Sequence, residues 1–283
     1  MSTPRLSTRT LTQDEILEFY RKGALTVRGL FNEEEVGLLQ KAAKGDTTIA
    51  SKIYGKEDAS GGVAKLCLWN DLGDDFFSMF GRVARMVEAA ETLLGGEEVY
   101  HYHSKLSIKE PYVGGAWEWH QDYGYWYNNG CLYPRMISCV IAIDRHTKEN
   151  GCLQVVEGSH HLGRINHGIT GQQAGADMER VQQVLKTSPP VHCELAPGDV
   201  LFTHCNTLHT SAPNPSPHPR WALIVCYNAK SNDPYKKHHH PQYTPLHKVT
   251  DNVLAEVGRE SMVKLDDGSF LLPKTDHSHT GDT

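Results

Sequence analysis

Residues 98–109, with the sequence EVYHYHSKLSIK, alternate between apolar and polar side chains over the length of a β-strand. A period of two predicts an extended strand with one apolar and one polar face. The apolar face carries Tyr100, Tyr102, Leu106 and Ile108, and the polar face carries His101, His103, Lys105, Ser107 and Lys109. A polar face normally meets solvent. In a small barrel around a polar site the same face points inward, and the alternation alone leaves both orientations open.

Strand-like runs recur through the chain after this point. They span residues 136–143, 153–156, 191–195, 199–203 and 221–227. Turn-forming pairs such as Asn150-Gly151 and Pro197-Gly198 separate several of them. Many short strands with turns between them are typical of a sandwich or a barrel, so we expect a mainly β fold here.

The first third of the chain has helical patterns instead. Thr12 and Glu15 have the spacing of a capping box, which predicts a helix that starts after Thr12. A second helix is expected after Asn32 and a third over about 74–94, which the Gly95-Gly96 pair ends. The remaining expectations are a short strand at 24–27, a surface loop at 44–62 and a helical insertion at about 173–187.

We therefore expect a single domain over residues 1–283. Its helical part covers about 12–95, its β core about 98–228, and a C-terminal extension 229–283. The length is compatible with one large β-rich domain, because such domains reach this size.

The composition excludes several classes of protein. The net charge of −6 gives no reason to expect nucleic acid or an anionic membrane as a partner. No apolar run approaches the roughly 18 residues that a membrane helix needs, and MSTPRLSTRT lacks the apolar segment of a signal peptide. Seven cysteines without a Cys-x-x-Cys pair argue against a disulfide framework and against a cysteine zinc site. We expect a cytoplasmic protein.

His120 and Asp122 form a His-x-Asp triplet within Trp117-Glu118-Trp119-His120-Gln121-Asp122. On an extended strand this spacing puts both side chains on one face. With a distant histidine they would form the 2-His-1-carboxylate triad that holds Fe(II) and leaves positions open for substrate and oxygen. His209 is the preferred third ligand, because Ser211 and Arg220 follow it. A guanidinium grips a carboxylate at two points, which suits the distal carboxylate of 2-oxoglutarate.

Other histidines are rivals for these roles. His192-Cys193-Glu194 is a second His-x-acid triplet, but it stands too close in sequence to His209 and leaves His120 and Asp122 unexplained. His204 is an alternative distal ligand that lacks an arginine and a serine at comparable positions. The run His238-His239-His240 is expected to be a solvated loop.

The motifs taken together resemble the phytanoyl-CoA dioxygenase family. The segment from His120-Gln121-Asp122 through residues 149–160 (ENGCLQVVEGSH) carries the resemblance. It continues in residues 197–202 (PGDVLF), residues 208–214 (LHTSAPN) and Arg220, and it covers roughly residues 14–228. The resemblance implies a double-stranded β-helix, the jelly roll of cupins, with added helices and with Fe(II), 2-oxoglutarate and O2 as cofactor and co-substrates.

The resemblance also implies roles for individual residues. The iron ligands would be His120, Asp122 and His209, and Arg220 with Ser211 would hold 2-oxoglutarate. Lys65, Lys105 and Ser107 would line the co-substrate pocket, which favours the inward orientation of the polar face of residues 98–109. Halogenating relatives lack the carboxylate, so Asp122 favours hydroxylation.

The substrate pocket is the least determined part of the site. Its candidates are Trp126, Tyr123 and His103, and strand alternation would point Trp126 the same way as Asp122. An aromatic wall suits an apolar or cationic small molecule, and core packing explains these aromatic residues equally well. We expect hydroxylation of a C–H bond in a small molecule, with succinate and CO2 as co-products. The alternatives are a cupin-like metalloenzyme that does not use 2-oxoglutarate and a non-catalytic binding or sensing module. The sequence leaves open the substrate (free or a CoA thioester), the carbon oxidised and the oligomeric state.

Overall fold

The structure is a computed structural model, and it describes residues 9–266. Its centre is an antiparallel sheet of seven strands in the order β1-β11-β6-β13-β4-β3-β2. In that order the strands span Ala24–Val27, Val200–His204, Met136–Ala142, Arg220–Ala229, Val99–Lys109, Val63–Trp69 and Tyr54–Glu57. Every residue of β6 is buried, because this central strand is covered on both faces.

A second sheet of four strands faces the first. Its order is β10-β7-β12-β5, and the strands span Val191–Cys193, Leu153–Val155, His209–Ser211 and Trp117–His120. A separate hairpin joins β8 (His167–Thr170) to β9 (Gln173–Ala176). Val140 and Ala222 from the large sheet pack against Val155 from the small one, so apolar side chains join the two sheets. This arrangement confirms the predicted mainly β, cupin-like jelly roll.

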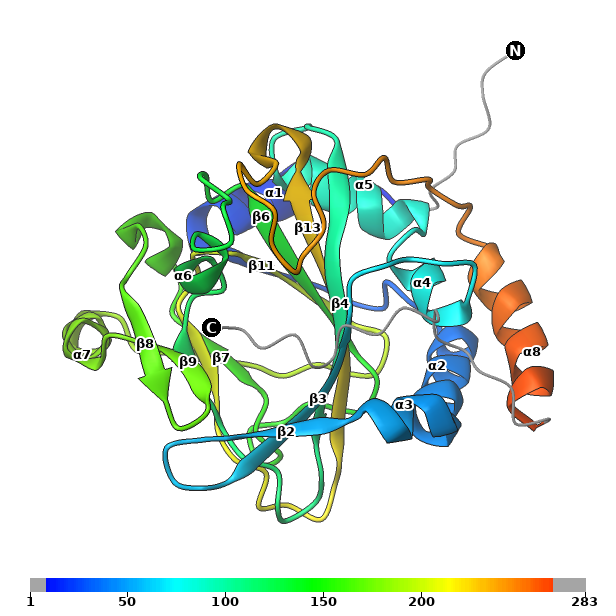
Figure 1. The fold of residues 1–283 in the computed structure, drawn as a ribbon, viewed down its shortest axis with the longest axis horizontal. Helices are drawn as coiled ribbons and strands as arrows, with labels where there is room; N and C mark the ends of the chain where they lie inside the picture. Colours follow the sequence, from blue (N-terminus) through cyan, green and yellow to red (C-terminus); the bar gives the residue numbers. More distant parts are fainter. Residues whose placement is uncertain (1–8, 267–283) are drawn as a thin grey trace.

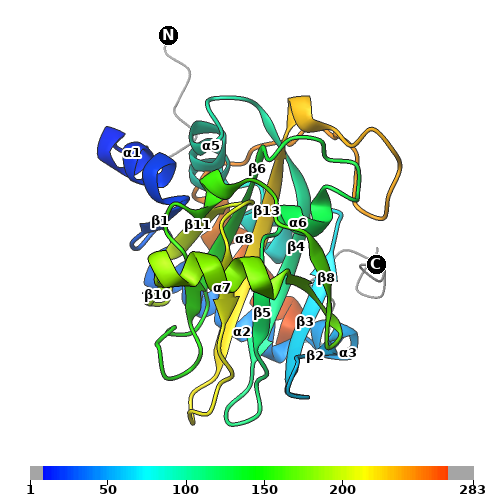
Figure 2. The ribbon, with the colours of Figure 1, turned by 90° about the vertical axis from the view of Figure 1, so that its left-hand side faces the viewer.

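Helices cover the outer faces of the sheets. They are α1 (Gln13–Lys22), α2 (Glu33–Gly45), α3 (Thr47–Lys52), α4 (Phe76–Phe80), α5 (Ala84–Leu93), α6 (Tyr123–Trp126), α7 (Met178–Thr187) and α8 (Val253–Asp266), with two short 3-10 turns, η1 (Ser159–Leu162) and η2 (Lys230–Asn232). Figure 1 shows α2, α3, α4 and α8 on one side of the large sheet, with β7 and β9 on the other. In Figure 2, α7 lies across the outside of the smaller sheet, where Val181 packs among Val156 and Leu208.

The first helix begins as predicted. The Thr12 side chain accepts from the Glu15 backbone N–H, and the Glu15 carboxylate accepts from the Thr12 backbone N–H. Such a cap contributes about 1 kcal/mol. Asn32 and Glu35 make the same box at the start of α2.

Three predicted segments differ from the structure. The predicted loop at 44–62 contains α3, capped by Asp46, and the edge strand β2. The predicted helix at 74–94 is two helices, because residues 82–84 pair with Val249 of the C-terminal extension. The Ala84 N–H donates to the Val249 carbonyl at 2.9 Å, and the Val249 N–H donates to the Arg82 carbonyl at 3.0 Å. The insertion at 173–187 is helical only from Met178, since its first residues form β9.

The polar face of β4 points inward. His103, Lys105 and Ser107 line a cavity between the two sheets, while Leu106 and Ile108 on the other face pack into the core beneath the helices. The inward orientation suggested by the family resemblance is the one that the structure has.

Candidate active site

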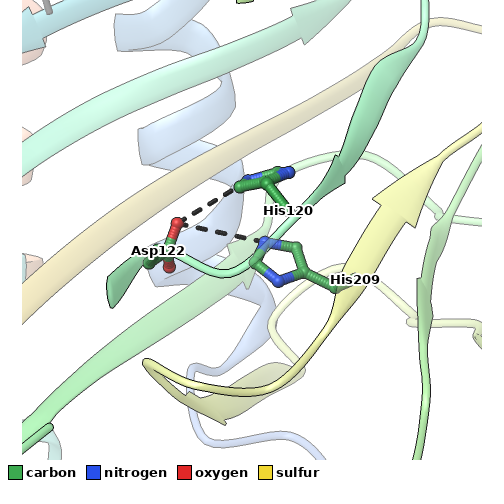
Figure 3. A group of neighbouring side chains, drawn as sticks. All are labelled: His120, Asp122 and His209. Atoms are coloured by element: carbon green, nitrogen blue, oxygen red, sulfur yellow. Dashed lines mark ion pairs between the residues drawn. The ribbon is translucent and has the colours of Figure 1, made fainter. Parts of the chain in front are cut away.

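His120 and His209 come from neighbouring strands of the smaller sheet. His120 is the last residue of β5, and His209, the first residue of β12, is paired directly with it. Asp122 lies just beyond β5, with its Oδ1 atom 3.7 Å from His120 Nε2 and 4.0 Å from His209 Nε2 (Figure 3). Within residues 9–266 these three form the one group of its kind, with ligand atoms that all lie within 4.8 Å of one another.

The backbone brings Asp122 into this group by a turn. Its torsion angles are helical, φ −56° and ψ −40°, because β5 ends at His120 and α6 begins directly after Asp122. The buried Gln121 amide anchors the turn by donating to the carbonyls of Gly163 and Asn206 at 2.8 Å each. His120 and Asp122 do share a cavity, but the prediction that one strand carries both is wrong.

Each histidine is oriented by a nearby backbone carbonyl. His120 Nδ1 lies 2.6 Å from the Glu118 oxygen, and His209 Nδ1 lies 2.8 Å from the Thr207 oxygen. A carbonyl only accepts, so Nδ1 carries the proton and the Nε2 lone pair is left for a metal ion. Burial lowers the pKa of His120, which keeps this imidazole neutral.

The Asp122 carboxylate is held at both oxygens. The Ser138 hydroxyl donates to Oδ2 at 2.6 Å and the Tyr125 hydroxyl donates to Oδ1 at 2.9 Å. Burial raises the pKa of Asp122, but the charges of His209 and Lys105 and the Ser138 hydrogen bond outweigh it, so the pKa lies below its usual value. Two imidazoles and one carboxylate are the donor set that suits Fe(II).

The strand register orders the cavity into rows. Ser138, Cys226 and His103 are level across β6, β13 and β4. Val140, Ile224 and Lys105 form the next row, then Ala142, Ala222 and Ser107, and finally Arg220 with Lys109. Because Ser138 binds Asp122, the metal ligands lie near the His103 row and Arg220 lies at the opposite end.

Arg220 is a buried cation with incomplete hydrogen bonding. It is 2% exposed, and its Nη1 atom donates to the Gly151 carbonyl at 3.0 Å. Its Nε atom has no partner among the described residues, nor does the nearby Ser211 hydroxyl. Burial lowers the pKa of Arg220 to about 10, so its charge is poorly compensated. A ligand carboxylate would satisfy both groups, which fits the distal end of 2-oxoglutarate.

The structure does not place every predicted co-substrate residue in the cavity. Lys105 and Ser107 line it from β4. Lys65 is not among its lining residues, because Leu66 and Leu68 of the same strand face inward and alternation turns Lys65 away. Lys56 of β2 lines the cavity instead. Lys56 could not be predicted as a lining residue, because the sequence of residues 44–62 has the pattern of a surface loop.

Two of the three predicted substrate-pocket residues line the cavity, and one does not. His103 and Trp126 line the cavity, whereas Tyr123 is turned away and its hydroxyl donates to the Cys131 carbonyl at 3.1 Å. The reason is that residues 123–126 form a helix, so Trp126 shares a face with Asp122 through a spacing of four, and strand alternation does not apply.

The rival histidines lie elsewhere, with one exception. His192 is exposed on β10, and His204 packs against Phe19 and His160. His240 is buried and lines the cavity, so the prediction of a solvated loop at 238–240 is wrong for this residue.

His240 reaches the cavity because the C-terminal extension folds back over it. The His240 ring stacks on His103 with centroids 4.8 Å apart and an interplanar angle of 22°. Its Nδ1 atom lies 2.9 Å from Asn70 Oδ1. The local sequence gives no signal for this contact, since it depends on the path of the extension.

Comparison with known proteins agrees with this geometry. The family model of phytanoyl-CoA dioxygenase matches residues 19–222. The chain belongs to the phytanoyl-CoA dioxygenase family. It is 27% identical over 237 residues to L-proline trans-4-hydroxylase of Streptomyces griseoviridis, covering 78% of this chain and 88% of that protein. It is 29% identical over 238 residues to ectoine dioxygenase of Stutzerimonas stutzeri, covering 77% of each.

Solved structures give the same result. EctD from S. alaskensis in its apoform matches with a TM-score of 0.71 and 25% identity, over 85% of this chain and 88% of that one. The structure of EctD with bound Fe matches over the same shares with a TM-score of 0.68 and 25% identity.

This member of the family is an Fe(II)- and 2-oxoglutarate-dependent dioxygenase of the hydroxylase type. The predicted cofactor, co-substrate and reaction class are confirmed, and the two alternative functions are set aside. Among the helices in the part of the chain that the structure describes, none is long and apolar enough to cross a membrane.

Proposed function

We propose that this dioxygenase hydroxylates a C–H bond of a free, carboxylate-bearing small molecule of the amino-acid type. His120, Asp122 and His209 hold the iron, and Arg220 with Ser211, Ser107 and Lys105 holds 2-oxoglutarate. The observation that carries the proposal is the buried triad in one cavity with a buried arginine that has no carboxylate partner among the described residues.

The charge of the cavity wall supports a substrate carboxylate. Its lining residues include the cations Lys105 and Arg220 and one carboxylate, Asp122. The two positive charges of Fe(II) and the two negative charges of 2-oxoglutarate cancel, so these two cations against one carboxylate leave an excess of one positive charge. In a buried site such an excess favours an anionic group and opposes a cationic substrate. The cationic substrate that the aromatic residues would suit is therefore disfavoured by the charge of the cavity.

The relatives support a small amino-acid type of molecule. Their names give L-proline and ectoine as substrates, and they match this chain over most of its length. The cavity is lined by side chains from both sheets, the β8–β9 hairpin, α6 and the extension, and the substrates that these relatives are named for are free small molecules and not CoA thioesters.

His103 and Trp126 supply the substrate end of the cavity. His103 is 2% exposed, and neither ring nitrogen has a partner among the described residues. Burial holds the pKa of His103 well below its usual value, so the neutral ring offers one donor and one acceptor. The Trp126 indole N–H is likewise buried without a partner in residues 9–266. A polar substrate group would give these buried atoms hydrogen-bond partners and so remove the free-energy cost of leaving them unpaired.

His240 orients His103 for this role. Asn70 Nδ2 donates to the His239 carbonyl at 2.5 Å, so Asn70 Oδ1 is free to act as acceptor and His240 Nδ1 carries the proton. With its tautomer set, the His240 ring is a fixed surface against which His103 stacks. We infer that the pair determines which substrates fit.

The chain's own residues position and protect the reaction. When bound, iron and 2-oxoglutarate supply the activation of O2 that oxidises a C–H bond, with succinate and CO2 as co-products. Ser138 and Tyr125 keep Asp122 ionised and fixed, and the apolar side chains of Leu68 and Trp126 exclude water from the cavity.

The proposal also covers the organisation and location of the chain. We take residues 1–283 as one catalytic domain, in which the extension contributes His240 to the cavity. A cytoplasmic location is supported by seven cysteines that are all free thiols.

A substrate panel tests the proposal. Succinate release is measured with L-proline, ectoine, their amides or esters that lack the carboxylate charge, and a CoA thioester. We expect release above the uncoupled rate for a carboxylate-bearing compound and none for its neutral analogue. Turnover of the CoA thioester, or equal turnover of charged and neutral analogues, would contradict the proposed substrate class.

A further inference from the structure

Lys109 is a buried cation for which the proposed reaction has no stated use. It is the last residue of β4, its exposed fraction is 0%, and it follows Ser107 on the face of the strand that points inward. Its direct partner across the sheet is Arg220 of β13. Like charges opposite each other in a sheet destabilise it, and burial increases the cost.

The Lys109 side chain holds the segment that carries the Ser211 hydroxyl. Its Nζ atom donates to the Ser211 carbonyl at 3.2 Å and to the Ala212 carbonyl. Asn214 Nδ2 in turn donates to the Glu110 carbonyl at 3.2 Å, which ties the same segment to the end of β4.

Gly151 completes this assembly from the turn that precedes β7. Its carbonyl accepts the Arg220 Nη1 hydrogen bond, and its φ is +75°. A Cβ atom at this position would lie 2.3 Å from the Ala212 carbonyl oxygen, so the backbones approach too closely for any larger residue. Lys109, Arg220 and the 211–212 segment are therefore fixed relative to one another.

The two cations lack a balancing anion. Neither Lys109 nor Arg220 makes an ion pair with a carboxylate in residues 9–266. Asp58 is the carboxylate whose charge favours the ionised form of Lys109, but its oxygens are taken by the N–H groups of Gly62 and Ala116. Burial, then the charge of Arg220, lowers the pKa of Lys109 well below its usual value.

We propose that Lys109 is a positioning residue for 2-oxoglutarate, which acts from behind Ser211 through the backbone of residues 211–212. Its ammonium group holds the Ser211–Ala212 backbone so that the Ser211 hydroxyl and the Arg220 guanidinium face one point, where the distal carboxylate of 2-oxoglutarate binds and reduces the excess of positive charge. The inference rests on the proposed co-substrate pocket.

Lys109→Met and Lys109→Gln test this role, with exposed Lys41→Met as the matched control. Methionine removes the charge and both hydrogen bonds at similar length, and glutamine keeps one donor without charge. We expect the Kd of 2-oxoglutarate for the Fe(II)-loaded protein to rise about 10-fold in both variants. The KM for 2-oxoglutarate should rise in parallel, while kcat at saturating co-substrate changes less than twofold.

Thermal unfolding separates this role from a purely structural one. Without 2-oxoglutarate, Lys109→Met should unfold at the wild-type temperature or above it, because a buried unpaired cation has been removed. The stabilisation on adding 2-oxoglutarate should be smaller than in wild type. A structural role would instead lower the midpoint and leave the Kd unchanged.

A wild-type Kd for 2-oxoglutarate in either folded variant would overturn the inference. Should Lys109→Met fail to fold, Lys109→Gln gives the same test. If the wild-type protein itself binds no 2-oxoglutarate, the co-substrate assignment fails. If wild type binds 2-oxoglutarate and Arg220→Met weakens that binding, but both Lys109 variants bind it with the wild-type Kd, only the role of Lys109 fails.

Discussion

The two ends of the cavity are built in different ways. At the end proposed to bind 2-oxoglutarate, called the co-substrate end, Arg220 and Ser211 stand on strands whose backbones are fixed by pairing in the two sheets. At the substrate end, Trp126 comes from a helix of one turn and His240 from the extension that folds over the barrel. His103 at that end stands on a paired strand.

The difference separates what the reaction requires from what selects its substrate. The co-substrate is the same in every turnover, and rigid strands hold its partners at fixed spacing. A helix and an extension change shape more readily than paired strands, so they are suited to setting specificity. The comparison predicts that changes at the strand-built end affect every substrate and changes at the other end affect only some.

The largest effect is expected at the metal ligands, on which both ends depend. Asp122→Ala should lower succinate release more than about 100-fold, since loss of outer partners alone costs about 10–100-fold. Bound iron, measured per protein, should fall in parallel. His192→Ala, which changes the exposed histidine of the rival triplet, is the control and should retain both. Substantial activity in Asp122→Ala would show that the ligand set is wrong.

At the co-substrate end, Arg220→Met should raise the KM for 2-oxoglutarate about 100-fold, because hydrogen bonds to charged groups contribute roughly 1.5–3 kcal/mol. The KM for the primary substrate should stay within about twofold of wild type when 2-oxoglutarate saturates. Exposed Arg135→Met serves as the control. An increase confined to the primary-substrate KM would reverse the assignment of the two ends.

Ser138→Ala tests the support of the metal ligand between the two ends. Removing the 2.6 Å hydrogen bond to Asp122 Oδ2 should weaken Fe(II) binding about 10-fold. Competition with a chelator measures it, with exposed Ser51→Ala for comparison. At saturating iron, the KM for 2-oxoglutarate and the KM for the primary substrate should both equal the wild-type values. A raised KM that persists at saturating iron would mean that Ser138 contacts a substrate directly.

The smallest effect belongs to the substrate end. His240→Ala removes the ring that orients His103 and should raise the primary-substrate KM about 10-fold, with the KM for 2-oxoglutarate unchanged. The change should vary between substrates, which the panel described above can measure. Exposed His161→Ala should match wild type. A uniform loss of kcat for every substrate would argue that the extension is needed only for folding.

The sequence predicted the parts that depend on local pattern. Alternation in residues 98–109 and the repeated turns indicated the β core, the capping box at Thr12 located the start of α1, and the run that begins at Asn32 located α2. The motifs around His120 and His209 indicated the metal group, because the His-x-Asp triplet and the Ser211 and Arg220 that follow His209 can be recognised in the local sequence.

The parts that depend on tertiary contacts were missed. Strand alternation gave the wrong conformation for Asp122, whose turn is held by Gln121 through contacts with distant residues. The break between α4 and α5 depends on Val249, and the position of His240 depends on Asn70. Lys56 lines the cavity where Lys65 was predicted to, because it lies on the edge strand β2, which is stabilised by pairing with β3. None of these contacts leaves a pattern in the segment that it shapes.

The most direct test of the central claim is anaerobic spectroscopy of the Fe(II)-loaded protein titrated with 2-oxoglutarate. We predict a weak visible charge-transfer band when 2-oxoglutarate binds at the iron. The titration should need far more 2-oxoglutarate in Arg220→Met and should give no band in Asp122→Ala. A folded, iron-loaded wild-type protein without the band, or an Arg220→Met titration identical to wild type, would contradict the account.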